Sequence, residues 1–324
     1  MSKNIIIVAG EPYSVFLELL FKSIKLKKIK KPFLLICSKK LLVAQMKKLK
    51  FNFKINTIEK HKIKKLKLSK NCINILDVKF KFNKVFDKIN KNSSKYIEKC
   101  FDEGFNVIKN SNAKILINGP VSKKYFLQKK FYGVTEYIAK KSGKKSHEVM
   151  LIYNNKLAVS PITTHLPLSE VSKKITTKKI IQNVTTINSF FKYKLKKKAK
   201  FAITGLNPHC ETIKNFSEEK RIILPAIKKL KKKKINIKGP FSADTLFLRK
   251  NVSKFNIVIG MYHDQVLTPI KTLYEFKAIN ITLGLPFLRI TPDHGPNNLM
   301  LGKNKSDPTS LIEIFTFLGQ ISDN

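Results

Sequence analysis

Arginine is scarce and tryptophan is missing from this sequence, although lysine is abundant. Arg221, Arg249 and Arg289 are its only arginines among 65 basic residues, against 21 acidic ones, so the formal net charge is +44. Proteins that read nucleic acids use arginine for bidentate contacts and place aromatic side chains within a basic patch. Lysine runs such as "KLKKKAK" are instead typical of solvated helix ends and loops. A basic nucleic-acid-associated protein without turnover stays an alternative, and it predicts binding that weakens steeply with salt.

Closely spaced cysteines and long apolar runs are also missing. Four cysteines are scattered without C-x-x-C spacing, so nothing indicates a structural zinc site or a disulfide framework. No apolar run approaches the roughly 20 residues that span a bilayer. The first residues lack the apolar stretch and the small-residue cleavage site of a secretory signal. We therefore expect a reduced, cytoplasmic protein with no membrane role.

Two glycine-rich nucleotide motifs are absent as well. The chain contains neither "GxGxxG" nor the Walker-type "GxxxxGK[ST]". These are strong sequence signs of a Rossmann dinucleotide site and of a P-loop. A nucleotide that binds here must use another arrangement.

The segments that are present alternate between two kinds. Short apolar runs rich in β-branched residues, such as "NIIIVAG" and "FNIVIGMY", are separated by helix-like stretches at 94–110, 175–195 and 218–232. This alternation predicts an α/β fold with a largely parallel sheet. In "EVMLIYNNKLAVSPIT", Asn154 and Asn155 separate two apolar runs, which indicates a hairpin.

Polar residues directly follow several predicted strands. "AITGL" leads into Asn207-Pro208-His209, "IKG" into "PFSADT", and "VIGMY" into His263-Asp264-Gln265. In open α/β sheets, ligands bind at the carboxyl ends of the strands. The polar residues therefore fall where a binding site is expected.

Three of the six histidines occur in such loop positions: His165, His209 and His263. Three imidazoles with an open position suit a catalytic divalent cation such as Zn²⁺, and neighbouring acids such as Asp264 could orient the rings. Their separations of 44 and 54 residues match no local zinc signature. From spacing alone, each could equally be a surface or core histidine.

Taken together, the motifs resemble those of a known family. "GEP", "NGPVSK", "THLPLSEV", "GLNPH", "GPFSADTLF", "MYHDQVLTPIK" and "INITLGLPFLRITPDHG" occur in the order found in 4-hydroxythreonine-4-phosphate dehydrogenases. The resemblance implies a two-lobed α/β/α subunit like those of isocitrate and isopropylmalate dehydrogenases. It places the active site in the inter-lobe cleft, at a homodimer interface. We expect one lobe over about 1–130 plus 290–324, and the other over about 131–289.

The resemblance also implies roles for particular residues. The metal ligands are His165, His209 and His263, the third supplied by the partner subunit. Substrate-binding positions are Thr135, Lys271, Asn280 and Arg289, and the catalytic positions are Asp244 and Lys271. The cofactor is NAD or NADP, with the region of Asp293 and His294 as its suspected site, and the cation is Zn, Mg or Co. Arg289 also attracts interest because a planar fork binds phosphate or carboxylate better than an ammonium does.

The implied reaction is the oxidation and decarboxylation of 4-(phosphooxy)-L-threonine to 3-amino-2-oxopropyl phosphate, in pyridoxal 5′-phosphate (vitamin B6) biosynthesis. A cation would lower the pKa of the substrate hydroxyl and favour hydride departure to the nicotinamide. It would then stabilise the enolate left by CO₂. A related dehydrogenase acting on a different phosphorylated hydroxy acid is also compatible with these motifs.

Three departures from the family pattern bear on substrate and activity. The family's "GHTE" reads Gly133-Val134-Thr135-Glu136, so an apolar side chain stands where a histidine contacts substrate. The glycines expected after His209 are replaced by "CETIKNFSEE". The segment after Gly295 is "PNNLMLG", which lacks an acidic residue that the family carries.

Overall fold

The computed structural model describes residues 4–128, 130–131, 133–143, 148–211, 217–292 and 294–321. The chain divides into two compact units, Met1–Glu148 with Leu285–Asp323, and Val149–Gly284. The sequence placed the boundaries near 130 and 289. The first lies later because helix α4 (Val134–Lys141) packs Tyr137 and Ile138 into the first unit's core. The second lies earlier because strand β12 (Leu288–Pro292) pairs with a strand of the first unit.

The first unit contains a parallel sheet. Its strands lie in the order β3 (Ile55–Thr57), β4 (Ile73–Asp77), β2 (Phe33–Cys37), β1 (Ile5–Val8), β5 (Ile115–Asn118) and β12. All residues of β1, β2 and β5 are buried. Near-continuous apolar sequences such as "IIIV" arise because both faces of a parallel sheet are covered by helices.

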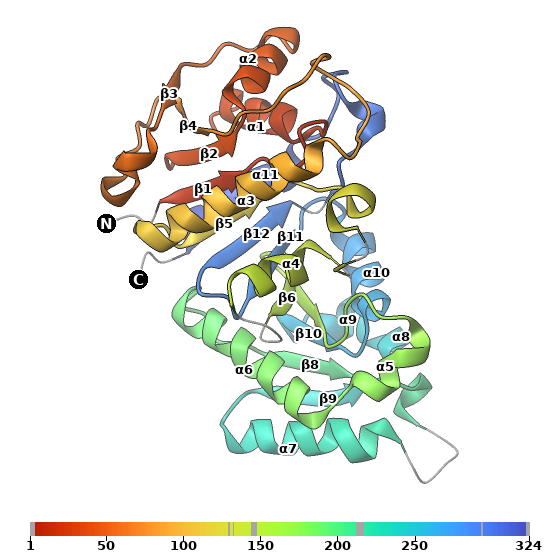
Figure 1. Ribbon diagram of the computed structural model, residues 1–324. Helices are drawn as coiled ribbons and strands as arrows, with labels where there is room; N and C mark the ends of the chain where they lie inside the picture. Colours follow the sequence, from red (N-terminus) through yellow and green to blue (C-terminus); the bar gives the residue numbers. More distant parts are fainter. Residues whose placement is uncertain are drawn as a thin grey trace. The chain divides into compact units, whose positions relative to one another are not determined.

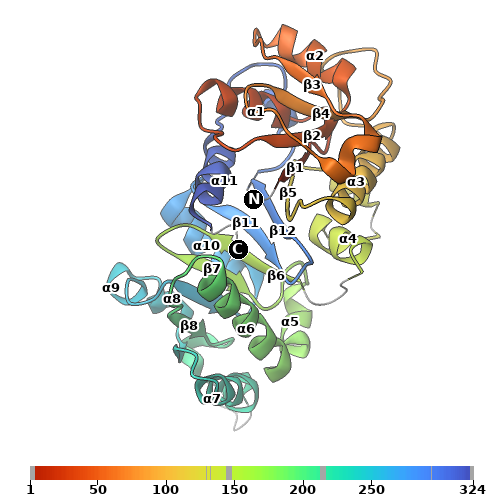
Figure 2. The ribbon, with the colours of Figure 1, turned by 90° about the vertical axis from the view of Figure 1, so that its left-hand side faces the viewer.

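Helices cover this sheet on both faces. They are α1 (Phe16–Lys25), α2 (Lys39–Lys48), α3 (Ser93–Asn110), α4 and α11 (Thr309–Gln320), with short helical turns at Lys60–Lys65, Lys123–Leu127 and Asn298–Met300. The predicted helix over 94–110 is confirmed by α3. Ile6 and Val8 of β1 share a core cluster with Ile97 and Phe101 of α3. In Figure 2, α3 lies on one side of the strands and α11 on the other.

The second unit has a mixed sheet in the order β11 (Ile279–Leu283), β6 (Val149–Tyr153), β7 (Ala158–Pro161), β10 (Ile257–Gly260), β8 (Phe201–Thr204) and β9 (Ile237–Phe241). β6 runs antiparallel to both neighbours, which confirms the predicted hairpin between β6 and β7. β7, β10, β8 and β9 are parallel. The α/β class with a largely parallel sheet was therefore predicted correctly.

Helices line both faces of this sheet too (Figure 1). They are α5 (Leu168–Lys174), α6 (Thr177–Tyr193), α7 (Leu224–Lys232), α8 (Ala243–Leu246), α9 (Arg249–Val252) and α10 (His263–Tyr274), with short turns at Pro208–Cys210 and Glu219–Ile223. Val266 and Ile270 of α10 pack with Val159 of β7 and Val258 of β10. Among the described residues, no helix is long and apolar enough to cross a membrane.

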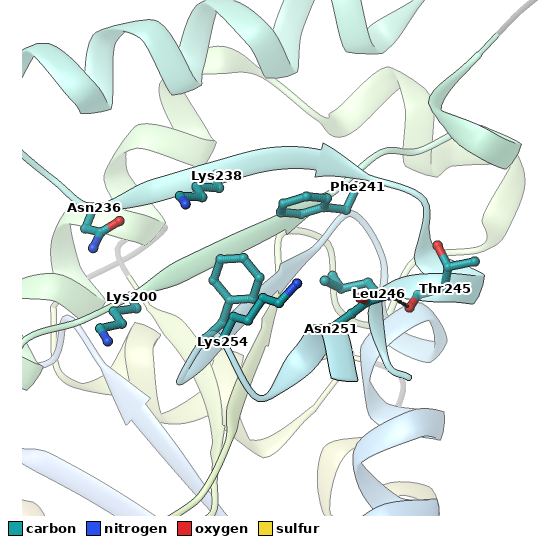
Figure 3. Close-up of a pocket in the computed structure, with 9 residues that line it drawn as sticks. Lys200, Asn236, Lys238, Phe241, Thr245, Leu246, Asn251 and Lys254 are labelled. Atoms are coloured by element: carbon teal, nitrogen blue, oxygen red, sulfur yellow. Dashed lines mark hydrogen bonds between the residues drawn. The ribbon is translucent and has the colours of Figure 1, made fainter. Parts of the chain in front are cut away.

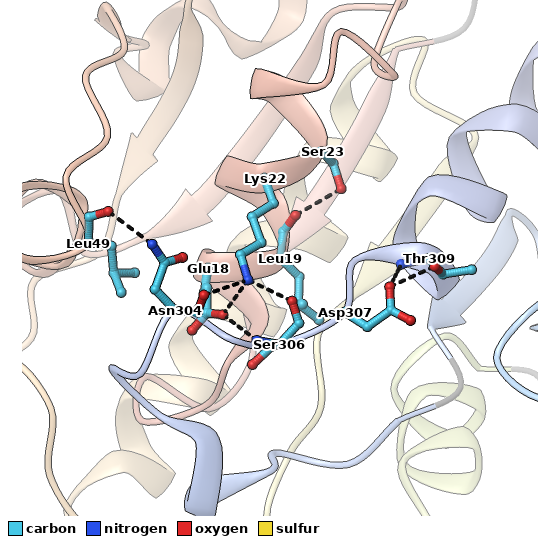
Figure 4. A network of polar contacts seen from close by, with 9 residues as sticks. All are labelled: Glu18, Leu19, Lys22, Ser23, Leu49, Asn304, Ser306, Asp307 and Thr309. Carbon is cyan, nitrogen blue, oxygen red and sulfur yellow. Dashed lines mark hydrogen bonds and ion pairs between the residues drawn. The ribbon is translucent and has the colours of Figure 1, made fainter.

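A charged contact ties the C-terminal segment of the first unit to α1. The Lys22 ammonium donates to Glu18 Oε1 at 3.0 Å and to the carbonyls of Asn304 and Ser306 at 3.1 and 2.7 Å (Figure 4). The Ser306 amide donates to the same Glu18 oxygen at 2.8 Å. Since Glu18 is 2% exposed, the ammonium neutralises a buried carboxylate while it holds the segment in place.

Glu11, directly after β1, is a second buried carboxyl group. It is 2% exposed, and its Oε2 accepts a hydrogen bond from Ser93 Oγ at 3.2 Å. Its Oε1 has no hydrogen-bond partner among the described residues. Burial raises the pKa of Glu11 to about 7, despite the opposing hydrogen bonds from Ser93 and the Tyr13 backbone. The fold therefore stabilises the protonated form.

This shift predicts how Glu11→Gln changes stability with pH. From about pH 4.5 to about pH 7 the folded carboxyl holds a proton that the unfolded chain releases, so the wild-type free energy of unfolding falls as pH rises. The neutral amide does not titrate, so the variant should gain up to about 3 kcal/mol relative to wild type across this window. Urea unfolding at about pH 4.5 and about pH 8 measures the change. An equal difference at both pH values would contradict the prediction.

Candidate active site

The three loop histidines follow three adjacent parallel strands of the second unit. The strand order is β7-β10-β8; His165 lies in the loop after β7, His263 begins α10 after β10, and His209 lies in the turn after β8. Parallel neighbours end at the same edge of a sheet. The topology therefore gathers residues separated by 44 and 54 positions at one edge.

Within this edge, the structure brings His165 and His263 together. Their ring centroids are 5.9 Å apart and the ring planes are inclined by 38°. Two imidazoles that share an ion at about 2.1 Å from each nitrogen have centroids about 5–6 Å apart, so this pair fits a divalent cation. Among the described residues of one chain, no group of three histidine, cysteine or acidic side chains is placed to hold an ion. His209 as a further ligand stays a prediction, and so does the supply of His263 by a partner subunit, although His165 and His263 pair here within one chain.

Asp264 orients the His263 ring. His263 Nδ1 lies 2.6 Å from Asp264 Oδ1. Because a carboxylate only accepts, Nδ1 carries the proton and Nε2 is left with the lone pair that a cation requires. This contact agrees with the orienting role expected for Asp264.

His209 lies on a strained turn next to Asp244. Its φ is 54°, and the side chain is exposed. The Asp244 carboxylate accepts from the Ser242 hydroxyl and from the Thr245 amide. These hydrogen bonds, the Ser242 hydroxyl foremost, together with the nearby His209 ring, hold the pKa of Asp244 below its usual range. Asp244 is therefore ionised at neutral pH and can accept hydrogen bonds or pair with a cation.

Gln265 links the loops that carry His209 and His263. Its Nε2 donates to the Gly205 carbonyl at 2.8 Å, and its Oε1 accepts from the Met261 amide at 2.7 Å and the Thr204 hydroxyl at 2.8 Å. The third loop is tied in as well, because the Thr163 hydroxyl donates to the Met261 carbonyl at 2.7 Å. These bonds connect all three histidine loops.

Glu219 fixes the start of the His209 loop. Its Oε1 accepts from the amides of Leu206 and Asn207 at 2.8 and 2.9 Å, and Oε2 accepts from the Asn207 side chain at 2.9 Å. Burial disfavours the charged form, but these donors outweigh it and lower the pKa of Glu219. Glu219 ends the segment "CETIKNFSEE". Its hydrogen bonds with the backbone amides of Leu206 and Asn207 could not be predicted from the sequence, because they form only in the folded turn.

Lys271 and Asn280 belong to the same unit. Lys271 lies eight residues after His263 on α10, so both occupy one helix face about two turns apart. Asn280 lies on β11, and its Oδ1 is buried without a hydrogen-bond partner among the described residues. A buried acceptor without a donor is costly, so this oxygen is suited to a ligand that donates.

The first unit brings together Arg289 and Thr135. Arg289 is 1% exposed, and it donates from Nε to Asn118 Oδ1 at 2.9 Å and from an Nη to Thr135 Oγ1 at 2.7 Å. Burial lowers the pKa of Arg289 to about 9, partly offset by Glu136, so the guanidinium stays charged at neutral pH. Asn118, within "NGPVSK", was not identified from the sequence as its partner.

The structure describes two of the remaining predicted positions, Val134 and His294. Val134 is half-buried and packs against the first unit's core, as expected of an apolar residue. His294 is half-buried, with Nδ1 2.8 Å from the Gly295 carbonyl. Asp293, and residues 212–216 of the altered loop after His209, lie outside the described residues.

Comparison with solved structures identifies the fold. The chain resembles isocitrate dehydrogenase from Methylococcus capsulatus with a TM-score of 0.50 and 9% identity, over 97% of this chain and 84% of that one. A crystal structure of 4-hydroxythreonine-4-phosphate dehydrogenase from Klebsiella pneumoniae matches with a TM-score of 0.81 and 23% identity over 99% of each chain. The chain shares the α/β fold of these two structures.

Sequence comparison identifies the family. The model of the family described as pyridoxal phosphate biosynthetic protein PdxA matches residues 28–317. A 4-hydroxythreonine-4-phosphate dehydrogenase from Sulfurihydrogenibium sp. is 39% identical over 312 residues, covering 95% of this chain and 94% of the relative. The chain belongs to the PdxA family.

The network around Gln265 predicts a measurable loss when its side chain is removed. Gln265→Ala leaves the Met261 amide and the Gly205 carbonyl without their partner, which should lower the free energy of unfolding by about 2 kcal/mol. Thr272→Ala on the same helix, whose hydroxyl bonds only the Thr268 carbonyl, is the matched control and should change it by less than about 1 kcal/mol. Urea unfolding compares the two; equal midpoints would refute the linking role.

Proposed function

We propose that this chain is a 4-hydroxythreonine-4-phosphate dehydrogenase. It oxidises and decarboxylates 4-(phosphooxy)-L-threonine to 3-amino-2-oxopropyl phosphate in pyridoxal phosphate biosynthesis, with NAD or NADP as hydride acceptor and a divalent cation. Membership of the PdxA family supports the reaction. The observation that carries the proposal is the placement of the three histidine loops at one sheet edge, with His165 and His263 spaced to share an ion.

The cation site would be built from His165, His209 and His263. Zn, Mg or Co held there would polarise the substrate hydroxyl and then the carbonyl formed from it. Asp264 holds the His263 ring, while Gln265 and Thr163 keep the three loops in register. We further propose a homodimer. The family resemblance places His263 on the second copy, whereas the spacing of the His165 and His263 rings within one chain favours a site that takes both histidines from the same copy.

The other residues would bind substrate and move protons. Arg289 would bind a phosphate or carboxylate oxygen, and Thr135 and Asn118 hold its fork in a fixed plane. Lys271 would pair with phosphate or return a proton to the enolate carbon after CO₂ leaves. Asp244, ionised and exposed, would position the substrate amino group or a proton-relay water.

One residue of the chain favours a second candidate substrate. Val134 cannot form the hydrogen bond made by the family's histidine, and it stands next to Thr135, which contacts Arg289. This substitution makes a related phosphorylated hydroxy acid the second candidate substrate. Binding to nucleic acid draws no support from the family relationship.

The metal proposal predicts the effect of His209→Ala. Divalent-cation affinity and kcat/KM for NAD(P)H formation should each fall at least about 100-fold, because one of three ligands is lost. Titration calorimetry with Zn²⁺ and with Co²⁺ measures affinity separately from turnover. The control is His61→Ala, whose ring is 71% exposed and contacts Glu59. If His209→Ala binds the cation as tightly as His61→Ala does, His209 is not a ligand.

The role of position 134 is tested by Val134→His. If the native reaction is retained, the added donor should raise kcat/KM for 4-(phosphooxy)-L-threonine by about tenfold, the worth of one hydrogen bond in a site. The assay is NAD⁺ and NADP⁺ reduction with this substrate and a panel of phosphorylated hydroxy acids, for wild type and variant. Wild-type turnover of another panel member, lost in the variant, would assign the chain to the second candidate substrate.

A further inference from the structure

An open cavity of about 520 Å³ lies on the α8–α9 side of the second unit's sheet, at the edge formed by β8 and β9 (Figure 3). Its lining consists of Lys200, Asn236, Lys238, Phe241, Thr245, Leu246, Asn251, Lys254 and Phe255. None of these residues has a role in the proposed reaction.

The strand register places two of the lysines on one face. Phe201 of β8 pairs with Ile237 of β9, and Ala202 pairs with Lys238. Because side chains alternate along a strand, Lys200, Ala202 and Lys238 face the same side, whereas Phe201 and Ile237 face the other. Figure 3 shows Lys200 and Lys238 at the same end of the cavity as Asn236.

Two aromatic rings form a wall further along the cavity. The rings of Phe241 and Phe255 are 5.5 Å apart and inclined by 55°, and buried Leu246 lies beside them. Lys254 lines the same part of the cavity (Figure 3). A flat ring can pack on these side chains while its substituent reaches the lysines.

The charge in the cavity is uncompensated. Among the described residues, no acidic side chain forms an ion pair with Lys200, Lys238 or Lys254. Asp244, next to the lining residue Thr245, has its carboxylate hydrogen-bonded to the Ser242 hydroxyl and the Thr245 amide. Three ammonium groups beside an aromatic wall select for an anion that carries a ring.

We propose that this cavity binds an aromatic phosphomonoester, with the phosphate between Lys200 and Lys238 and the ring against Phe241 and Phe255. The pyridoxine-type phosphates at the end of the family's pathway have this chemistry, so the site would sense the pathway's product; this part rests on the proposed function. The ligand would touch Thr245 and Leu246 of α8, the helix that carries Asp244. Occupancy can therefore shift the position of Asp244 without blocking the histidine edge.

Titration calorimetry of the full chain with pyridoxine 5′-phosphate tests the proposal, because this probe lacks the aldehyde that would react with surface lysines. We expect saturable binding, one per chain. Binding should weaken at least about tenfold in Lys200→Ala/Lys238→Ala, given about fivefold for each exposed ion pair. The matched control is Lys228→Ala/Lys232→Ala, which removes the same charge from exposed positions on α7 and should leave the affinity unchanged.

Two further probes separate the contributions. Pyridoxine without phosphate should not bind measurably, and inorganic phosphate should bind more weakly than the ring-bearing probe; Phe255→Ala should remove that advantage. The proposal is overturned if pyridoxine 5′-phosphate does not bind, or if Lys200→Ala/Lys238→Ala leaves its affinity intact. It is also overturned if the two double lysine variants lose affinity equally. Since no turnover is needed, a chain without dehydrogenase activity would still give a clear result here.

Discussion

The candidate site depends on the parallel pairing of β7, β10 and β8. This pairing brings three loops to one edge, but pairing alone leaves loops free to move relative to one another. Gln265 and Thr163 remove that freedom, because each joins the backbone of one loop to that of its neighbour. Glu219 then fixes the turn that leads to His209. Positioning in this site is therefore achieved by side chains that need not touch the substrate.

Much of the fold follows from patterns visible in the chain. The β-branched runs, the helix at 94–110 and the turn at Asn154–Asn155 each reflect local sequence, and the structure agrees with them. The unit boundaries do not follow from local sequence. Helix α4 belongs to the first unit through the packing of Tyr137 and Ile138, and β12 belongs to it through its pairing with β5. Such memberships depend on contacts between distant segments, which periodicity does not encode.

The candidate site, too, could be predicted only in part from the sequence. Motifs identified Thr135 and Arg289 separately, and the structure joins them directly at 2.7 Å. Asn118, which fixes the other side of the guanidinium, could have been suspected from its place at the carboxyl end of β5. The linking role of Gln265 could not be predicted, because it donates to the Gly205 carbonyl and accepts from the Met261 amide, backbone groups that any sequence would supply.

Arg289 also explains why one arginine stands where lysine outnumbers it 62 to 3. Its Nε and one Nη reach Asn118 and Thr135 at the same time, from a rigid plane that is 1% exposed. A lysine has a single nitrogen at the end of a flexible stem, so it would leave one of these two oxygens unbonded inside the protein. The bias of the composition toward lysine thus meets a geometric limit at this position, because lysine would keep the charge but lose one of the two buried hydrogen bonds.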